Sequence, residues 1–416
     1  MSDTIIVEVV LKNKKSQLES TVQECVLKYF KSNPISPGCI IKTFPNDIIL
    51  RDLVECIIID DVPESQENFI DFSFFKIHWY IYTVNYSKPM VQNEYSSDGE
   101  INIATHLVLP NADLTNSWEN LYFDNDIKDN LLKYAHTMMK FSDNGIDGNV
   151  VTCNKVILLH GPPGTGKTSL CKALSHKLAV RMQERYHSGL FIEVNSHSLF
   201  SRYFSESGKL VTQMFSSIRD VIENGNILVC VLIDEVESLA HAREQCLSGV
   251  EPSDSIRVVN AVLTQIDQIK RYPNVLILAT SNLTKSIDLA FIDRADIKQY
   301  LGLPKVPAIY KIYVSCLQEL QRVNILDNNV KFEPLSTILK INLDNLNEIS
   351  RKLLEICEKS SGLSGRALRK VPFISHALFC NADNNSVWDF LIAMDKAVEK
   401  EKGDRTVFDQ VAIVST

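Results

Sequence analysis

One short segment of the chain combines glycine, lysine and hydroxyl side chains at the spacing of a phosphate-binding loop. The sequence GPPGTGKT follows the apolar run VILLH and opens the helical stretch TSLCKALSHKL. Glycines let backbone amides turn toward a phosphate, and the N-terminus of the following helix adds its positive dipole end. This Walker A pattern, in its strand-to-helix context, predicts a nucleotide-binding loop. The loop comprises Gly161, Pro162, Pro163, Gly164, Thr165, Gly166, Lys167, Thr168 and Ser169.

An acidic pair at the end of an apolar strand supplies the second half of a hydrolytic site. The run ILVCVLI ends in Asp234 and Glu235. Open α/β sheets bind ligands at the carboxyl ends of their strands, which places the pair beside the glycine loop. There, Lys167 would reach the β- and γ-phosphates, while Thr168 and Asp234 would hold Mg²⁺. Glu235 is placed to polarise a water for attack on the γ-phosphate.

Three polar side chains farther along the chain are candidates to complete this site. Asn282 follows the run NVLILATS and resembles the sensor 1 residue of AAA+ proteins, which orients the attacking water. Arg294, flanked by Asp293 and Asp296, forms either a local salt bridge or, as in an AAA+ ring, an arginine finger toward the neighbouring subunit's γ-phosphate. Arg366, in LSGRALRK, resembles sensor 2. A cation near a helix start opposes the helix dipole, so a phosphate partner would explain it.

The elements that must position these residues alternate along the middle of the chain. Apolar runs begin at residues 156, 190, 227, 274 and 297, with helical stretches between them. This alternation predicts an α/β domain with a five-stranded parallel sheet over residues 101–303, and the motifs above resemble those of an AAA+ P-loop ATPase. Residues 304–416 read as helical and predict a lid domain. The stretch WENLYFDNDIKDNL, ahead of the first strand, is a candidate for contacts to adenine.

The first 100 residues have a different pattern and predict a separate α+β domain. Strand-like runs (TIIVEVV, DIIL, CIIID, FFKIHWYIYTV) surround one stretch of helical periodicity, LESTVQECVLKYF. The polar segment NYSKPMVQNEYSSDGE follows and contains Pro, Gly and Ser without periodicity. It reads as a linker, with the domain boundary near residue 100.

Composition excludes several classes of protein. The 416 residues are 45% apolar and 23% charged, as in ordinary globular proteins. A net charge of −8 disfavours direct binding of nucleic acid. No apolar run approaches the roughly 18 residues of a membrane span, and no basic segment precedes an apolar one at the start, so neither a membrane protein nor a secreted one is expected. Ten cysteines without a CxxC pair indicate a reducing compartment, the nucleus or cytoplasm.

Taken together, these motifs resemble one family. The segments EPSDSIRVVNAVLTQIDQIKRYPNV and DLAFIDRADIKQY, with the Walker motifs and LSGRALRK, are similar to the pachytene checkpoint protein family of remodellers over about residues 105–380. The resemblance implies a homohexameric, ATP-dependent ring that unfolds or converts HORMA-domain proteins. It further implies roles in meiotic chromosome-axis control and spindle-checkpoint disassembly, with the N-terminal domain recruiting substrate through a HORMA-type adaptor.

The resemblance also places a pore loop on Arg202, Tyr203 and Phe204, where aromatic rings would grip an extended polypeptide. Many AAA+ proteins carry a second arginine three residues before the position of Arg294, but Phe291 stands there in this chain. We therefore expect trans stimulation of hydrolysis to rest on Arg294 alone.

Two kinds of activity remain open at this point. One is a motor that threads its protein partner through the ring. The other is a nucleotide-gated binding module whose slow ATP hydrolysis only times release of the partner. A motor acting on DNA is disfavoured by the acidic charge, and GTP is disfavoured because no NKxD-type motif follows the Walker segments.

Overall fold

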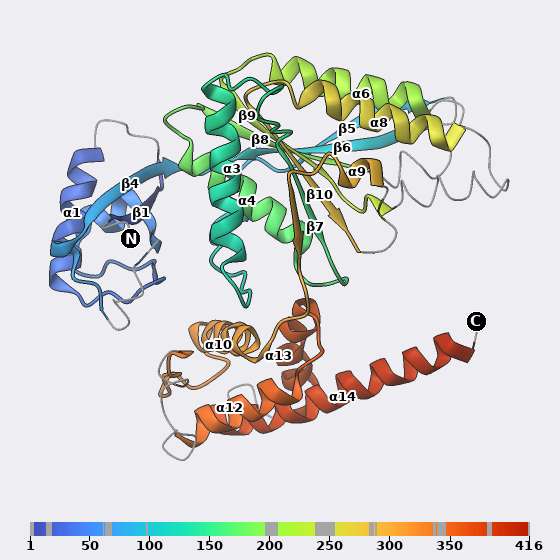
Figure 1. Ribbon diagram of the computed structural model, residues 1–416. Coiled ribbons are helices and arrows are strands. Elements are labelled where there is room, and N and C mark those ends of the chain that lie inside the picture. Colours follow the sequence, from blue (N-terminus) through green and yellow to red (C-terminus); the bar gives the residue numbers. More distant parts are fainter. Residues whose placement is uncertain are drawn as a thin grey trace.

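The computed structural model describes residues 4–13, 19–60, 62, 69–96, 99–195, 207–237, 254–282, 287, 289–335, 338, 347–380 and 385–414. These residues form an N-terminal α+β domain, a central domain built on a large sheet, and a helical domain at the C-terminal end (Figure 1). The predicted fold class is confirmed.

The N-terminal domain is a four-stranded sheet covered by a helix. Its strand order is β2-β3-β1-β4, with β1 antiparallel to β3 and parallel to β4. Helix α1 places Val22, Val26 and Phe30 against the alternate strand residues Ile5, Val7 and Val9. The elements are β1 (Thr4–Leu11), α1 (Glu19–Ser32), β2 (Ile40–Ile41), β3 (Val54–Asp60) and β4 (Lys76–Thr83).

The run DIIL, expected to be strand-like, is instead the start of a short helix, α2 (Ile48–Leu53). The carboxylate of Asp47 caps this helix and accepts a hydrogen bond from the backbone N–H of Leu50 at 2.9 Å. The strand prediction was wrong because a local capping bond, which the isoleucines do not reveal, favours helical backbone at this point.

The central domain is built on a seven-stranded sheet of order β11-β7-β10-β9-β8-β6-β5. The five strands from β11 to β8 are parallel to one another, as predicted. Two antiparallel strands extend this sheet beyond β8. The strands are β5 (Met90–Ser96), β6 (Gly99–Leu109), β7 (Val156–His160), β8 (Ser188–Val194), β9 (Ile227–Ile233), β10 (Val275–Ser281) and β11 (Ile297–Tyr300).

The predicted linker over residues 85–100 is therefore wrong. Strand β5 pairs with β6 as a hairpin, and the amide of Gln92 contacts His106 Nε2 at 2.8 Å. The sheet of the central domain thus begins at Met90, before the expected boundary at residue 100. Polar residues suit a strand at the edge of a sheet, so their composition imitates that of a linker.

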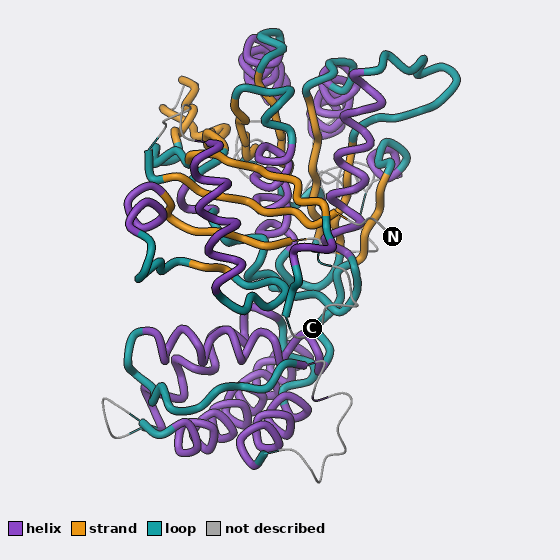
Figure 2. The backbone as a smooth tube through the Cα atoms, turned by 90° about the vertical axis from the view of Figure 1, so that its left-hand side faces the viewer, coloured by secondary structure: helices purple, strands orange, loops and turns teal. Residues whose placement is uncertain are grey.

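Helices cover both faces of the sheet, as the side view in Figure 2 shows. In β7, Val156 and Leu158 point to one hydrophobic core, while Ile157 and Leu159 point to the other. Burial on both faces explains why the parallel strands are apolar throughout. Helices α6 (Ser207–Ile222) and α8 (Asp254–Ile269) cover the first face, and α3 (Ile127–Asp143) and α4 (Lys167–Arg181) cover the second.

The C-terminal domain is a helical bundle with its own core, as predicted. Buried Tyr313, Leu353, Leu368 and Phe390 come from four different helices and belong to one cluster. The helices are α10 (Val306–Arg322), α12 (Glu348–Lys359), α13 (Gly365–Phe379) and α14 (Val387–Val414). Figure 1 shows α10 and α13 on the side of the bundle that faces the central domain.

A buried ion cluster joins the N-terminal domain to α4, the helix that follows the glycine loop. The ammonium of Lys177, 2% exposed, lies 2.8 to 2.9 Å from carboxylate oxygens of Glu8, Asp60 and Glu119. Arg181 pairs with Glu8 and Asp60 at 2.9 Å. These carboxylates raise the pKa of Lys177, against the effect of burial, which alone would lower it. The N-terminal domain is thus packed on the nucleotide-binding domain through charged groups that solvent barely reaches.

The nine cysteines in the described part of the chain are all free thiols. No helix among the described residues is long and apolar enough to cross a membrane.

Candidate nucleotide-binding and hydrolysis site

A cavity of about 210 Å³ lies where the glycine loop, the ends of β9 and β10, and the start of α13 meet. Most of the predicted site residues line it, although they are spread over 204 positions of the sequence, from 163 to 366. Their roles in catalysis stay predictions, but their convergence is a structural fact. The lining residues are Pro163, Gly164, Gly166, Lys167, Thr168, Ser169, Asp234, Glu235, Asn282 and Arg366.

The glycine loop has the backbone shape that its sequence predicts. Gly161 and Gly164 have φ values of 144° and 76°, which side chains other than glycine rarely tolerate. A Cβ at Gly161 would collide with the backbone carbonyl of Leu301, and one at Gly164 would lie 2.8 Å from Ser364 Oγ. The loop is therefore closely packed on its outer side and fits a phosphate cradle on its inner side.

Lys167 begins α4 and is 5% exposed. Its ammonium donates to the carbonyl oxygens of Gly161 and Pro162, each at 2.8 Å. Burial lowers the pKa of Lys167, and the charges of Glu237, Asp234 and Glu235 act in the opposite direction. An incompletely compensated cation inside the loop is suited to an anionic ligand such as a phosphate.

Thr168 and Asp234 lie next to each other in the lining of the cavity. The hydroxyl of Thr168 lies 3.1 and 3.2 Å from the two carboxylate oxygens of Asp234. One hydroxyl and one carboxylate form a donor set that fits Mg²⁺, which usually binds to one or two carboxylates and completes its shell with waters and phosphates. The residues present therefore fit the predicted metal.

Glu235 and Asn282 are held together as a pair. The amide Nδ2 of Asn282 donates to Glu235 Oε1 at 3.3 Å. Glu235 has a φ of 56°, and its backbone N–H donates to the hydroxyl of Thr280 at 3.3 Å. Left-handed backbone at a residue with a long side chain is uncommon and is found repeatedly at functional sites. It turns an exposed carboxylate into the cavity beside the predicted sensor amide.

Arg366 reaches the cavity because the helical domain is docked on the glycine loop. The hydroxyl of Ser364 caps α13 by accepting from the N–H of Ala367 at 3.4 Å. The backbone N–H of Arg366 donates to the carbonyl of Gly164 at 3.1 Å. The lid thus contributes one cation to a site that otherwise belongs to the central domain.

A second cavity, of about 200 Å³, adjoins the loop between the central and helical domains. Its walls include Tyr122, Phe123 and Ile127 from the stretch proposed for adenine, together with Thr165 and Gly365. Mixed aromatic and backbone polar groups beside the phosphate cradle are suited to a nucleotide base. Contact with adenine remains a prediction.

Arg294 does not line either of these two cavities. Its guanidinium pairs with Asp267 of α8, with Nη2 at 2.7 Å and Nε at 3.2 Å from the carboxylate. It also donates to the carbonyl of Ala290 at 2.6 Å. Asp296, expected as a local partner, instead accepts from the backbone N–H groups of Asn154 and Val156. Within one chain Arg294 thus forms a local salt bridge, while its action on a neighbouring subunit remains a prediction.

The pore-loop residues Arg202, Tyr203 and Phe204 lie outside the described residues. Two residues of the site were not predicted. Thr280, 1% exposed, hydrogen-bonds Asp234 through its hydroxyl, and Glu237, 8% exposed, accepts from the backbone of Asn282. The signals that could have found them are a hydroxyl inside an otherwise apolar strand and a third acid in the sequence DEVE.

A parallel sheet with a phosphate loop after β7, and a helical domain docked over that loop, is the architecture of an AAA+ ATPase. Two family models agree. The model of the ATPase family associated with various cellular activities matches residues 157–303, and that of the TRIP13-like AAA+ ATPase lid C-terminal domain matches residues 305–402.

Comparison with individual proteins identifies the family more narrowly than these two models do. The chain is 46% identical to the pachytene checkpoint protein 2 homologues of Rattus norvegicus and Homo sapiens, over 96% and 97% of its length and 94% of theirs. The solved structure of C. elegans PCH-2 is similar, with a TM-score of 0.77 and 32% identity over 97% of this chain and all of that one. The chain therefore belongs to the pachytene checkpoint protein 2 family, and it is an ATPase.

A more distant similarity shows the fold alone. A chain in the solved E. coli HORMA:CdnC:Trip13 complex has a TM-score of 0.52 and 19% identity, and the match covers 70% of this chain and 94% of that one.

Proposed function

We propose that the protein uses ATP hydrolysis to convert or partially unfold HORMA-domain proteins, as a ring of six identical subunits. The observation that carries the proposal is the meeting of both predicted Walker motifs, Asn282 and the lid residue Arg366 in one cavity. A match that covers 94% of the mammalian relatives supports it. So does the E. coli complex, in which a chain of the same fold is named together with a HORMA protein.

The residues of the cavity divide the chemistry among them. Lys167 and Arg366 hold the phosphate chain of ATP, and Thr168 and Asp234 hold Mg²⁺, which supplies charge neutralisation when bound. Glu235 accepts a proton from the attacking water, and the amide of Asn282 keeps that water and the carboxylate in register. Because hydrogen bonds within the protein hold Asn282 against Glu235 and Thr168 against Asp234, little reorganisation of these groups is needed at the moment of reaction.

The remaining roles require a neighbouring subunit and a substrate. Arg294 acts as a finger on the next subunit's nucleotide, so an isolated subunit hydrolyses ATP slowly. Tyr203 and Phe204, with Arg202 beside them, grip the substrate polypeptide in the pore through aromatic contact. The N-terminal domain receives the substrate through a HORMA-type adaptor.

We further propose that the protein acts in the nucleus and cytoplasm, in control of the meiotic chromosome axis and in spindle-checkpoint disassembly. The family name supports these roles. A fluorescent fusion expressed in its own cells would be found in both compartments and on meiotic chromosomes. Exclusion from the nucleus throughout meiosis would contradict the proposal.

The experiment that tests remodelling uses a purified HORMA-domain protein with its adaptor. Conversion of the HORMA protein and native mass are measured for the wild type, Glu235→Gln, Tyr203→Ala and Tyr203→Trp. The proposal requires a hexamer in which Glu235→Gln and Tyr203→Ala abolish conversion. Tyr203→Trp should retain it, because tryptophan keeps an aromatic ring at the gripping position.

Conversion by Tyr203→Ala at the wild-type rate would overturn the threading mechanism. In that case the pore does not grip, and the nucleotide-gated binding module becomes the better account of the activity.

A further inference from the structure

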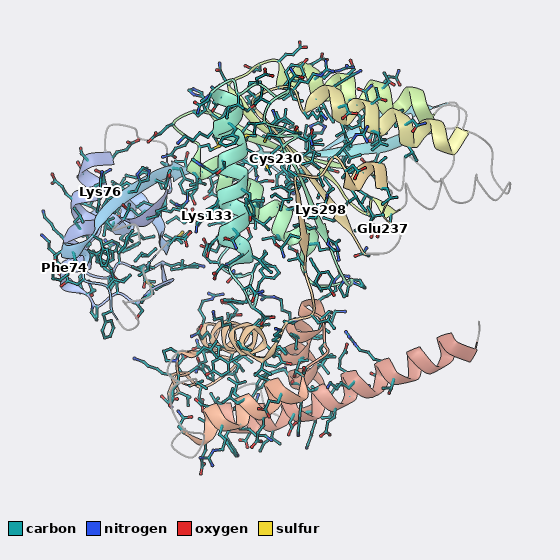
Figure 3. The ribbon with its side chains drawn as sticks, in the orientation of Figure 1. Phe74, Lys76, Lys133, Cys230, Glu237 and Lys298 are labelled. Carbon is teal, nitrogen blue, oxygen red and sulfur yellow. The ribbon has the colours of Figure 1, made fainter. Side chains whose placement is uncertain are left out.

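Glu237 is a buried carboxylate that none of the steps above uses. It lies two residues after Glu235, is labelled in Figure 3, and is 8% exposed. Its Oε1 accepts a hydrogen bond from the backbone N–H of Asn282 at 3.0 Å. The side chain therefore connects the segment after β9 to the segment after β10.

This bond is the outermost of several that tie these two segments together, which also include the side-chain bonds from Thr280 to Asp234 and from Asn282 to Glu235. The N–H of Val236 donates to the carbonyl of Thr280 at 2.9 Å, and the N–H of Glu235 donates to the hydroxyl of Thr280 at 3.3 Å. Both of these bonds end on Thr280, inside the sheet. Among the described residues, the bond from Glu237 is the one that reaches the backbone of Asn282 itself.

The second oxygen of Glu237 makes a merely structural role hard to explain. Oε2 is buried and has no hydrogen-bond partner within the described residues. Burying a carboxylate oxygen without a partner is costly, so stability alone does not account for this residue. What Glu237 contributes is the acceptor of its other oxygen, which holds the backbone N–H of Asn282.

We propose that Glu237 is a positioning residue for ATP hydrolysis. Its carboxylate fixes the backbone of Asn282 and thereby holds the Asn282 amide against Glu235. The inference rests on the predicted roles of Glu235 and Asn282 in hydrolysis, and it is independent of the proposed partner and of threading.

The test measures steady-state ATP hydrolysis by the full-length protein with three variants of Glu237. Glu237→Met removes the acceptor and keeps the size of the side chain. Glu237→Asp keeps the charge but withdraws the oxygen by one methylene, and Glu237→Gln keeps the acceptor but removes the charge. Thermal denaturation and binding of a fluorescent ATP analogue check that each variant folds and retains the site.

The proposal predicts that kcat falls roughly 10- to 100-fold in Glu237→Met and Glu237→Asp, because a small misplacement of a catalytic group costs about this much. The KM for ATP should change by less than about threefold in both variants, since Asn282 is assigned to the hydrolytic step and not to binding. Glu237→Gln should recover most of the lost kcat. If Glu237→Met does not fold, Glu237→Asp decides the question.

A double variant separates positioning from a general structural effect. If Glu237 acts through Asn282, adding Glu237→Met to Asn282→Ala should lower kcat by less than about twofold further, because both changes disable the same group. Multiplied losses in the double variant, or a Glu237→Asp enzyme with wild-type kcat, would overturn the proposal. An equal loss in Glu237→Gln and Glu237→Met would also overturn it, because the acceptor would then not be what matters.

Discussion

At the scale of single residues, the site depends on a threonine that carries no chemistry of its own. Thr280 is 1% exposed, and its hydroxyl contacts both the carboxylate of Asp234 and the backbone N–H of Glu235. One hydroxyl thus fixes the predicted metal ligand and the predicted general base at the same time. The carboxylate of Glu237 likewise holds Asn282, by accepting a hydrogen bond from its backbone N–H.

We expect Thr280→Val to lower kcat/KM for ATP by about 10- to 100-fold. Valine has a similar shape but removes the hydroxyl that holds the carboxylate of Asp234 and the N–H of Glu235, at a cost of about 1 to 3 kcal/mol. A titration with Mg²⁺ in the hydrolysis assay should also show that half-maximal activity requires a higher concentration of the metal. Thr280→Ser keeps the hydroxyl and is the matched control. Wild-type kinetics in Thr280→Val would show that this hydroxyl does not organise the site.

At the scale of secondary-structure elements, Arg294 connects two helices whose ends meet. It follows α9 (Leu289–Ile292) and pairs with Asp267 of α8. The two side chains are 26% and 34% exposed, so the pair adds little to stability. Among the described residues, Asp267 and Ala290 accept from three of the five N–H groups of this guanidinium, and the other two have no acceptor there. The pair therefore orients Arg294 without using up its hydrogen-bonding capacity.

We expect Arg294→Ala to reduce the ATPase rate of the assembled protein roughly 1,000-fold, the usual effect of losing an arginine finger. Phe291 occupies the place where a second arginine often stands, so no other finger compensates. Asp267→Asn breaks the same ion pair but keeps the arginine, and it should retain far more activity. Equal, small effects of the two variants would show that Arg294 is only a local salt bridge.

At the scale of the whole molecule, the N-terminal domain is fastened to the helix that begins with Lys167. The ion cluster of Lys177, Arg181, Glu8, Asp60 and Glu119 lies at the other end of α4 from the phosphate loop. The cluster therefore connects the N-terminal domain to the helix that follows the phosphate loop.

Lys177→Met should lower the free energy of unfolding by about 3 to 5 kcal/mol, because it leaves three carboxylates without their shared cation. Lys172, on the same helix, pairs with Glu193 at 2.8 Å and is 32% exposed, so Lys172→Met should cost less than about 1 kcal/mol. Urea denaturation of the two variants measures the difference. Equal stability would mean that the cluster does not fasten the domains.

How much of this could be predicted from the sequence depends on how local each feature is. The glycine loop, Asp234 and Glu235 each sit directly after an apolar strand, so a short pattern reveals both the element and the residue. The hairpin of β5 and β6 was missed because the residues of β5 are largely polar and read like a linker. Thr280, Glu237 and Asp267 were missed for a different reason, since their partners are 27 to 46 residues away.

The measurement that tests the central claim most directly is ATP turnover by Glu235→Gln alongside binding of ATP. The carboxamide keeps the shape of the side chain and the hydrogen bond to Asn282 but is not a base. We predict that Glu235→Gln binds ATP about as tightly as the wild type and hydrolyses it at least about 100-fold more slowly. Turnover within about threefold of the wild type would contradict the assignment of this cavity as the hydrolytic site.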